Sequence, residues 1–304
     1  MFEKIYKTRR EKFGAIISLE HPEALIYINE KVANMLKIPQ PSFELPPTFL
    51  SAPLDVHFSL TSNCKYKCEG CYQKNLINNN NVDIQYQQAK TIIDNLSGMN
   101  VFTVAFGGGE PLLNNDLFQI ATYTRNKKII PTLTTSGYEI TTLDPQKFRV
   151  FSNIHLSIHS LEDLDLLEKN ISHLRKTGIY PGLNILLSRK TFPYLDDIFQ
   201  FIKLNKIRKV LFLKFKINDN NFQSSYLKLS IEDEQKLYPI LKKFSKKLQI
   251  KIIIDCSLFP AIAIHRGCPK RIVKYYRTSI MIDNLYSNYT INKKRPGRGR
   301  FLFM

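Results

Sequence analysis

The sequence predicts an α/β protein in which helices connect parallel strands of a single sheet. Between residues 55 and 217, short segments rich in Val, Ile, Leu, Phe and Thr recur at regular intervals, as expected for strands buried on both faces. Segments with helical periodicity and helix caps lie between them. This order favours right-handed crossovers, in either an open barrel or a doubly wound sheet.

The first predicted strand, residues 55–60, is followed by five more at 102–106, 131–135, 153–159, 182–188 and 209–217. Helices are predicted at about 83–97, 115–126, 163–177 and 194–204, with a short one near 144–149. An Asn precedes the apolar face of the second helix, and Gly178 ends the third. Ligands of such folds bind at the C-terminal ends of the strands, so we expect functional residues there.

The flanking segments divide the chain into four parts. Residues 1–50 contain a predicted hairpin, a short helix and a Pro-rich linker at 39–47. Residues 51–217 form the core, and residues 218–265 complete it with a helix at about 230–247 and a strand. Residues 266–304 have the biased composition of a disordered basic tail.

Composition argues against nucleic-acid-binding, membrane and secreted proteins. The net charge is +18, and half of it lies between residues 266 and 304, which contain ten basic residues and one acidic residue. Trp is absent and no aromatic–basic RNA motif occurs, which argues against nucleic-acid binding. The chain lacks an apolar run of the ~20 residues that a membrane span needs and a signal peptide. We therefore expect a cytoplasmic protein without a membrane partner.

Three of the five cysteines, Cys64, Cys68 and Cys71, lie on one short segment directly after the first strand. Zinc sites usually close at four ligands from two pairs, whereas Cys256 and Cys268 are twelve residues apart. Sulfur ligands on one tight loop suit an iron–sulfur cluster. Three thiolates on a [4Fe–4S] cube would leave one iron open for a substrate or cofactor.

The second predicted strand ends in a glycine-rich turn, "AFGGGEPLLN". The glycines from Gly107 to Gly109 would let a ligand approach the backbone, and a Cβ at Gly109 is expected to crowd that ligand. Glu110 and Pro111 follow at the strand end. Taken alone, this segment also fits an ordinary tight turn.

Together the two motifs resemble those of the radical SAM superfamily over residues 52–217. The resemblance implies a partial (β/α)6 barrel with a [4Fe–4S] cluster on Cys64, Cys68 and Cys71. It also implies that S-adenosylmethionine chelates the fourth iron and is cleaved reductively. The resulting 5′-deoxyadenosyl radical would abstract a hydrogen atom from the substrate.

The resemblance further implies a set of cofactor contacts. Gly108, Gly109 and Glu110 are expected to hold the methionine amino group, with Pro111 fixing the turn. Tyr72 follows the last cysteine, where the family places the adenine; its alternative role is core packing.

Two serines complete the predicted contacts. Ser136 and Ser157, on the third and fourth strands, match positions that contact the methionyl or ribose part, although either could simply cap a strand end. His155, Ser157 and His159 alternate and therefore share one face of the fourth strand. If that face lines the barrel, His159 would reach the substrate; a structural role is the alternative.

The chain is similar to SPASM-type members that modify peptides or proteins, and residues 1–50 resemble their precursor-recognition domain. A complete SPASM module needs about seven cysteines for auxiliary clusters, which take four thiolates each. Here only Cys256 and Cys268 remain, so the C-terminal extension is degenerate and neither is expected to be a ligand. A truncated or frame-shifted product is one interpretation.

We therefore predict a radical SAM enzyme with a peptide or protein substrate and a reductant such as flavodoxin or ferredoxin. No residue is assigned to the chemical step itself. One alternative is a non-catalytic product that binds a cluster or leader peptide without turnover. A second is a radical SAM enzyme that modifies nucleic acid.

Overall fold

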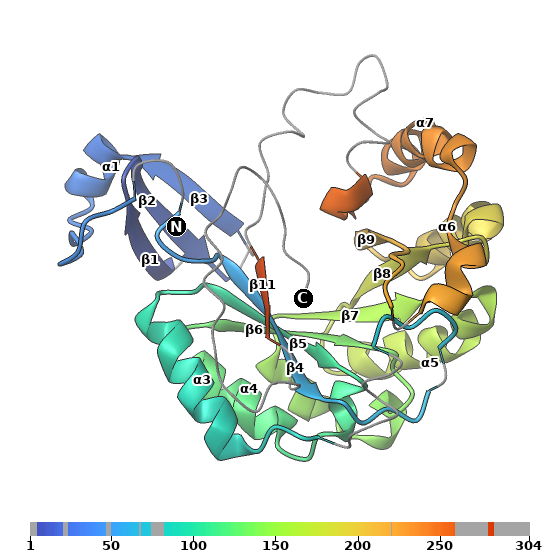
Figure 1. Cartoon of the computed structure of the whole chain (residues 1–304), viewed down its shortest axis with the longest axis horizontal. Coiled ribbons are helices and arrows are strands. Elements are labelled where there is room, and N and C mark those ends of the chain that lie inside the picture. The colour runs from blue at the N-terminus through green and yellow to red at the C-terminus, as the bar shows by residue number, and fades with distance from the viewer. Residues whose placement is uncertain are drawn as a thin grey trace.

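The computed structural model describes residues 5–20, 24–46, 50–66, 68–73, 82–219, 221–258 and 279–282. Within those residues, eight strands form one parallel sheet and three strands form a separate antiparallel sheet near the N-terminus. Figure 1 shows the two sheets side by side, with helices around the larger one.

The large sheet follows the order β10-β9-β8-β7-β6-β5-β4-β11, and every neighbouring pair is parallel. From β4 to β10 the spatial order is the chain order, because each crossover returns the chain to the next position. Its strands are β4 (Asp55–Thr61), β5 (Thr103–Gly108), β6 (Ile130–Thr135), β7 (Asn153–Ile158), β8 (Gly182–Leu187), β9 (Lys209–Lys214), β10 (Lys251–Ile254) and β11 (Ser279–Ile282).

Helices cover one face of this sheet (Figure 1). They are α3 (Tyr86–Gly98), α4 (Leu117–Asn126), α5 (Leu164–Arg175), α6 (Leu195–Leu204) and α7 (Ile231–Leu248). Short 3-10 helices are η1 (Pro111–Leu113), η2 (Ile140–Thr142), η3 (Pro145–Val150), η4 (Leu161–Asp163), η5 (Phe192–Tyr194), η6 (Phe222–Leu227) and η7 (Cys256–Leu258). The crossover from β6 to β7 contains only η2 and η3, as the short predicted helix indicated. The predicted partial (β/α)6 barrel is confirmed by β4–β9.

The two faces of the sheet differ in polarity. Alternate residues such as Val56 and Phe58 on β4 are fully buried against the helices. The opposite face is partly exposed and carries polar side chains, including Thr132, Thr134 and Ser157. The composition of the strands had predicted burial on both faces, but only one face is apolar. The other, polar face can contact a ligand.

The N-terminal unit contains β1 (Ile5–Glu11), β2 (Gly14–Leu19), β3 (Ala24–Asn29) and α1 (Glu30–Met35). The predicted hairpin and short helix correspond to β2, β3 and α1, and β1 adds a third strand that the sequence patterns did not indicate. The side chain of Asn29 caps α1 by accepting a hydrogen bond from Val32 N at 3.0 Å.

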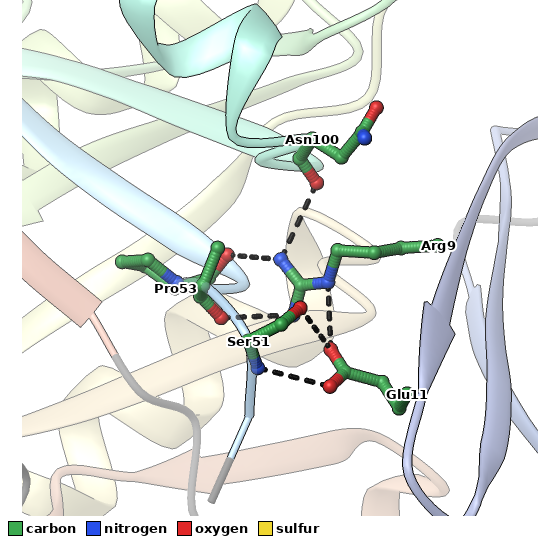
Figure 2. Close-up of polar contacts among 6 residues, drawn as sticks. Arg9, Glu11, Ser51, Pro53 and Asn100 are labelled. Carbon is green, nitrogen blue, oxygen red and sulfur yellow. Dashed lines mark hydrogen bonds and ion pairs between the residues drawn. The ribbon is translucent and has the colours of Figure 1, made fainter. Parts of the chain in front are cut away.

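A buried ion pair fixes this unit to the barrel (Figure 2). Arg9 and Glu11 are 4% and 2% exposed, and Arg9 Nε donates to Glu11 Oε1 at 2.8 Å. Arg9 Nη1 donates to the carbonyls of Pro53 at 2.8 Å and Asn100 at 3.3 Å, directly before β4 and β5. Glu11 accepts from Ser51 N at 2.9 Å. The N-terminal unit therefore docks at the N-terminal ends of these strands.

Most of the predicted basic tail, including Cys268, lies outside the described residues. The described part, Ser279–Ile282, is β11, which pairs with β4 from Ser279↔Asp55 to Ile282↔Phe58. A strand thus occurs where disorder was predicted, and the four-part division of the chain stays a prediction. None of the helices in the described part of the chain is long and apolar enough to cross a membrane.

Candidate functional site

The cysteine loop leaves the C-terminal end of β4. Cys64, Cys68 and Cys71 are half-buried free thiols, and Cys64 Sγ donates to the carbonyl of Tyr66 at 3.7 Å. Burial raises the pKa of Cys64 and raises that of Cys68 to about 12, and charge on the neighbouring thiols acts in the same direction. Three thiols that influence one another's ionisation lie close together.

These thiols fit a cluster better than a single ion. Within the described ranges, no three Cys, His, Asp or Glu side chains converge tightly enough to hold one metal ion. A [4Fe–4S] cube is larger than one ion, and three of its irons would each take one thiolate. Iron binds thiolates rather than thiols, so the positive cluster would supply the charge that stabilises them.

The glycine turn after β5 holds one side of the cysteine loop. Gly109 N donates to Thr61 O at 2.7 Å, and Glu110 N donates to Asn63 O at 2.9 Å. A Cβ on Gly109 would lie 2.3 Å from Asn63 O. Gly108 has φ +123°, and its Cβ would lie 2.5 Å from Thr61 O. Both glycines therefore allow backbone to pack on backbone.

The glycines were predicted to leave room for a ligand, whereas the contacts in the structure are with the cysteine loop. A Cβ at Gly109 would meet the cysteine loop itself, at Asn63 and Cys64, and the crowding of a ligand stays a prediction. Only Gly107 has open space within 4 Å of its Cβ position among these three glycines.

The loop after β9 holds the other side of the cysteine loop. Asn221 is 3% exposed, and its Nδ2 donates to Gly70 O at 2.9 Å and to Lys216 O at 2.8 Å. Asn218 Nδ2 donates to Tyr72 O at 3.1 Å. The first and last strands of the partial barrel are thus joined at their C-terminal ends. Sequence analysis assigned residues 218–265 only a helix and a strand and gave Asn221 no role; the run of asparagines at a strand end was the available signal.

Glu110 joins the glycine turn to β6. Its side chain is 1% exposed. Oε1 accepts from Thr135 Oγ1 at 2.6 Å and Leu112 N at 3.2 Å, while Oε2 accepts from Ser136 N at 2.9 Å and Ser136 Oγ at 2.5 Å. Burial raises the pKa of Glu110, and the hydrogen bonds from Ser136 and Thr135 oppose that rise. The carboxylate is occupied by four donors, so its side chain fixes the position of Ser136.

A buried asparagine on α5 extends this network. Asn170 is fully buried, and its Nδ2 donates to Gly137 O at 2.8 Å. Gly137 has φ +89°, and its N–H donates to Thr135 Oγ1 at 2.9 Å. Asn170 therefore holds the turn that carries Ser136. Sequence reasoning missed it, although an amide among the apolar positions of an amphipathic helix was a signal.

The remaining predicted residues lie around the polar face. Ser157 is half-buried on β7 opposite Asn184, whereas His155 is buried and its Nδ1 lies 2.6 Å from Asn184 Oδ1. His159 follows β7, and its N–H donates to Asp163 Oδ2 at 2.7 Å. Tyr72 is 47% exposed, so it does not pack in the core. Pro111 is buried at the first position of η1.

An aromatic pair beside the cysteines was also missed by sequence reasoning. The rings of Tyr66 and Tyr138 stack with centroids 4.0 Å apart. Tyr66 Oη donates to the Glu139 carboxylate, and burial together with Glu139 raises the pKa of Tyr66. The pair therefore links the cysteine loop to the segment after β6.

Comparison with known proteins places this site in a family. Residues 56–175 match the family model described as a 4Fe-4S single cluster domain. Fe-coproporphyrin III synthase from Methanosarcina barkeri is 22% identical over 239 residues, covering 72% of this chain and 59% of the relative. Mycofactocin maturase MftC from Mycolicibacterium smegmatis is 33% identical over 92 residues, covering 30% of this chain and 23% of the relative.

The chain is therefore similar, over part of its length, to iron–sulfur domains and to these two enzymes. The crystal structure of Streptococcus suis SuiB bound to precursor peptide SuiA shares the fold of this chain, with a TM-score of 0.65 at 16% identity. The match covers 92% of this chain and 81% of SuiB. The family model supports the predicted [4Fe–4S] cluster, and SuiB, which shares the fold, was also solved bound to S-adenosylmethionine.

The curated relatives extend beyond the matched region. The chain spans 59% of the length of the coproporphyrin enzyme and 23% of that of the maturase. The names of these two relatives also refer to different substrates. Substrate and overall reaction are therefore matters for proposal.

Proposed function

We propose that the chain is an enzyme that binds a [4Fe–4S] cluster through Cys64, Cys68 and Cys71, cleaves S-adenosylmethionine and acts on a peptide or protein. The observation that carries the proposal is the packing of the cysteine loop on the glycine turn, through Gly109 N to Thr61 O and Glu110 N to Asn63 O. When bound, the cluster and cofactor would supply reductive cleavage and a radical able to abstract hydrogen.

The residues of the chain position the cofactor and shield it from water. The glycine turn binds the start of the cysteine loop and Asn221 binds its end, so the three thiolates would be presented from a restrained backbone. Glu110 holds Ser136 at the rim, where its hydroxyl can meet the amino acid part of the cofactor. Ser157 lies on the polar face of the sheet, and it is the proposed contact for the ribose or methionyl part.

The polarity of the open face supports a peptide substrate. The described residues on this face include Thr132, Thr134 and Ser157, which offer hydroxyl groups. A peptide carries matching N–H and C=O groups along its whole length. The relation to MftC and the fold shared with SuiB, which was solved with a precursor peptide, point in the same direction. A small acidic electron-transfer protein remains the proposed reductant.

The test is anaerobic reconstitution with iron and sulfide, followed by reduction with dithionite in the presence of S-adenosylmethionine. We expect a brown [4Fe–4S] chromophore and 5′-deoxyadenosine in the product mixture. Short peptides encoded beside the gene are then added, and mass change is followed by mass spectrometry. Cofactor binding without 5′-deoxyadenosine would support the non-catalytic alternative, whereas cleavage with modification of RNA but of no peptide would overturn the peptide substrate.

A further inference from the structure

A pocket in the N-terminal unit shares no residue with the cofactor site. It has a volume of about 250 Å³ and lies between the end of β1, the start of α1 and the segment 40–45. Its lining includes Arg10, Lys12, Glu30, Gln40, Phe43 and Leu45. The pocket is too small for a nucleotide or a tetrapyrrole, but it can hold one amino-acid side chain.

Arg10 is the buried charge of this pocket. The residue is 5% exposed, and its Nη2 donates to Asn34 Oδ1 at 2.7 Å. With its amide oxygen turned toward the guanidinium, Gln40 accepts from Nη2 at 2.7 Å and from Nε at 3.2 Å. Nη1 is buried and has no hydrogen-bond partner among the described residues. One end of the guanidinium fork is therefore unsatisfied.

The two acids that line the pocket leave Arg10 Nη1 without a hydrogen bond. Glu11 points to the opposite side of β1, where its carboxylate binds Arg9 and Ser51 (Figure 2). The Glu30 carboxylate lies 3.7 Å from Arg10 Nη2, and its side chain is 67% exposed at the pocket edge. A buried guanidinium with an unpaired amino group is unfavourable, and a carboxylate is the acceptor that best matches its fork.

We propose that this pocket takes one acidic side chain, from Asp or Glu, of the peptide substrate. The inference rests on the proposed function. The carboxylate binds Arg10, with Lys12 adding positive charge at the edge. An apolar neighbour in the peptide packs on Phe43, which is 60% exposed beside the pocket. The N-terminal unit thus recognises charge and an adjoining apolar group together.

The position of the pocket sets a minimum spacing within that peptide. The Arg9–Glu11 pair fixes the N-terminal unit at the N-terminal ends of the strands, whereas the cysteine loop lies at their C-terminal ends. A strand of seven residues such as β4 spans about 20 Å. An extended chain covers at most about 3.5 Å per residue. The acidic residue and the modified residue are therefore separated by at least about six residues.

The test measures carboxylate binding independently of turnover. N-acetylglutamate N-methylamide is titrated into the full-length apoprotein, and the Arg10 Nε–H signal is followed by NMR. N-acetylglutamine N-methylamide is the neutral control, and N-acetylalanine presents a C-terminal carboxylate instead. We expect a saturable shift with the glutamate probe, a tenfold or greater loss of affinity in Arg10→Gln, and at least a twofold loss in Phe43→Ala once an apolar residue is added to the probe.

Matched variants keep the result interpretable. Arg10→Lys retains charge without the fork and should recover only part of the affinity, whereas Lys12→Gln should lose less than threefold. Equal shifts with the glutamine probe, undiminished binding by Arg10→Gln, or a preference for N-acetylalanine would each overturn the assignment. If Arg10→Gln does not fold, Arg10→Lys and Phe43→Ala decide the matter. Formation of 5′-deoxyadenosine without carboxylate binding would reject this site and leave the proposed function standing.

Discussion

Replacing Gly109 by alanine should disturb the cysteine loop before it affects any ligand. The added Cβ would lie 2.3 Å from Asn63 O, 2.9 Å from Asn63 C and 3.1 Å from Cys64 Cβ. Ordinary contact needs about 3.5 Å, so the two backbones must separate by about 1 Å. That separation strains the hydrogen bonds from Gly109 N to Thr61 O and from Glu110 N to Asn63 O.

The magnitude follows from these contacts. Overpacking of a tight site costs about 1–3 kcal/mol, and weakening two hydrogen bonds adds about 1 kcal/mol. We therefore expect a loss of about 2–4 kcal/mol in the free energy of unfolding. A chain of this length has an unfolding entropy of about 0.6 kcal/mol/K, so the melting temperature should fall by about 3–6 °C.

Gly107→Ala is the matched control, because its Cβ meets open space. Differential scanning fluorimetry of the apoproteins should show a lower melting temperature for Gly109→Ala and an unchanged one for Gly107→Ala. After anaerobic reconstitution, Gly109→Ala should hold less iron, since Cys64 is displaced. Equal melting temperatures and equal iron contents in the two variants would refute the backbone-packing argument. Retention of the cluster with loss of the cofactor response alone would restore the ligand-crowding explanation.

Three further predictions follow from the site and the N-terminal unit. Cys64→Ala, Cys68→Ala or Cys71→Ala should each abolish 5′-deoxyadenosine formation and most of the roughly four irons per chain; full product formation by any one variant would contradict the cluster assignment. Asn170→Leu should weaken S-adenosylmethionine binding several-fold at unchanged iron content, because the Ser136 turn loses its anchor. Asn205→Leu, at the buried asparagine that caps the C-terminus of α6, is its control, and equal effects on binding would indicate general destabilisation. Burial, assisted by Arg9, lowers the pKa of Lys7 from 10.5 to about 8. Between pH 8 and pH 10.5 Lys7 is therefore protonated in the unfolded chain and neutral in the folded one, and the free energy of unfolding of the wild type should rise with pH across this range. Lys7→Met should remove this rise, so the variant should exceed the wild type in free energy of unfolding most below pH 8 and least near pH 10.5. If urea unfolding shows the same difference in free energy at every pH, the linkage is disproved.

Local patterns were sufficient to predict most of the barrel. The strands β4–β9 and the helices between them correspond to the predicted segments within a few residues, because apolar periodicity and caps act over short distances. The placement of Cys64, Cys68 and Cys71 after β4, and of the glycines after β5, also follows from sequence order. Adjacent parallel strands bring their C-terminal ends to the same edge.

The sequence by itself therefore determined the fold class, the cysteine loop and the neighbouring glycine turn. Only the tertiary structure decided what holds them: Asn221 reaches Gly70 across 151 residues, and Arg9 reaches Asn100 across 91. It also decided that Gly109 packs on Asn63 and that β11 joins β4. Such contacts depend on where distant segments meet after the crossovers close, and no local periodicity records which buried amide or charge will face which carbonyl.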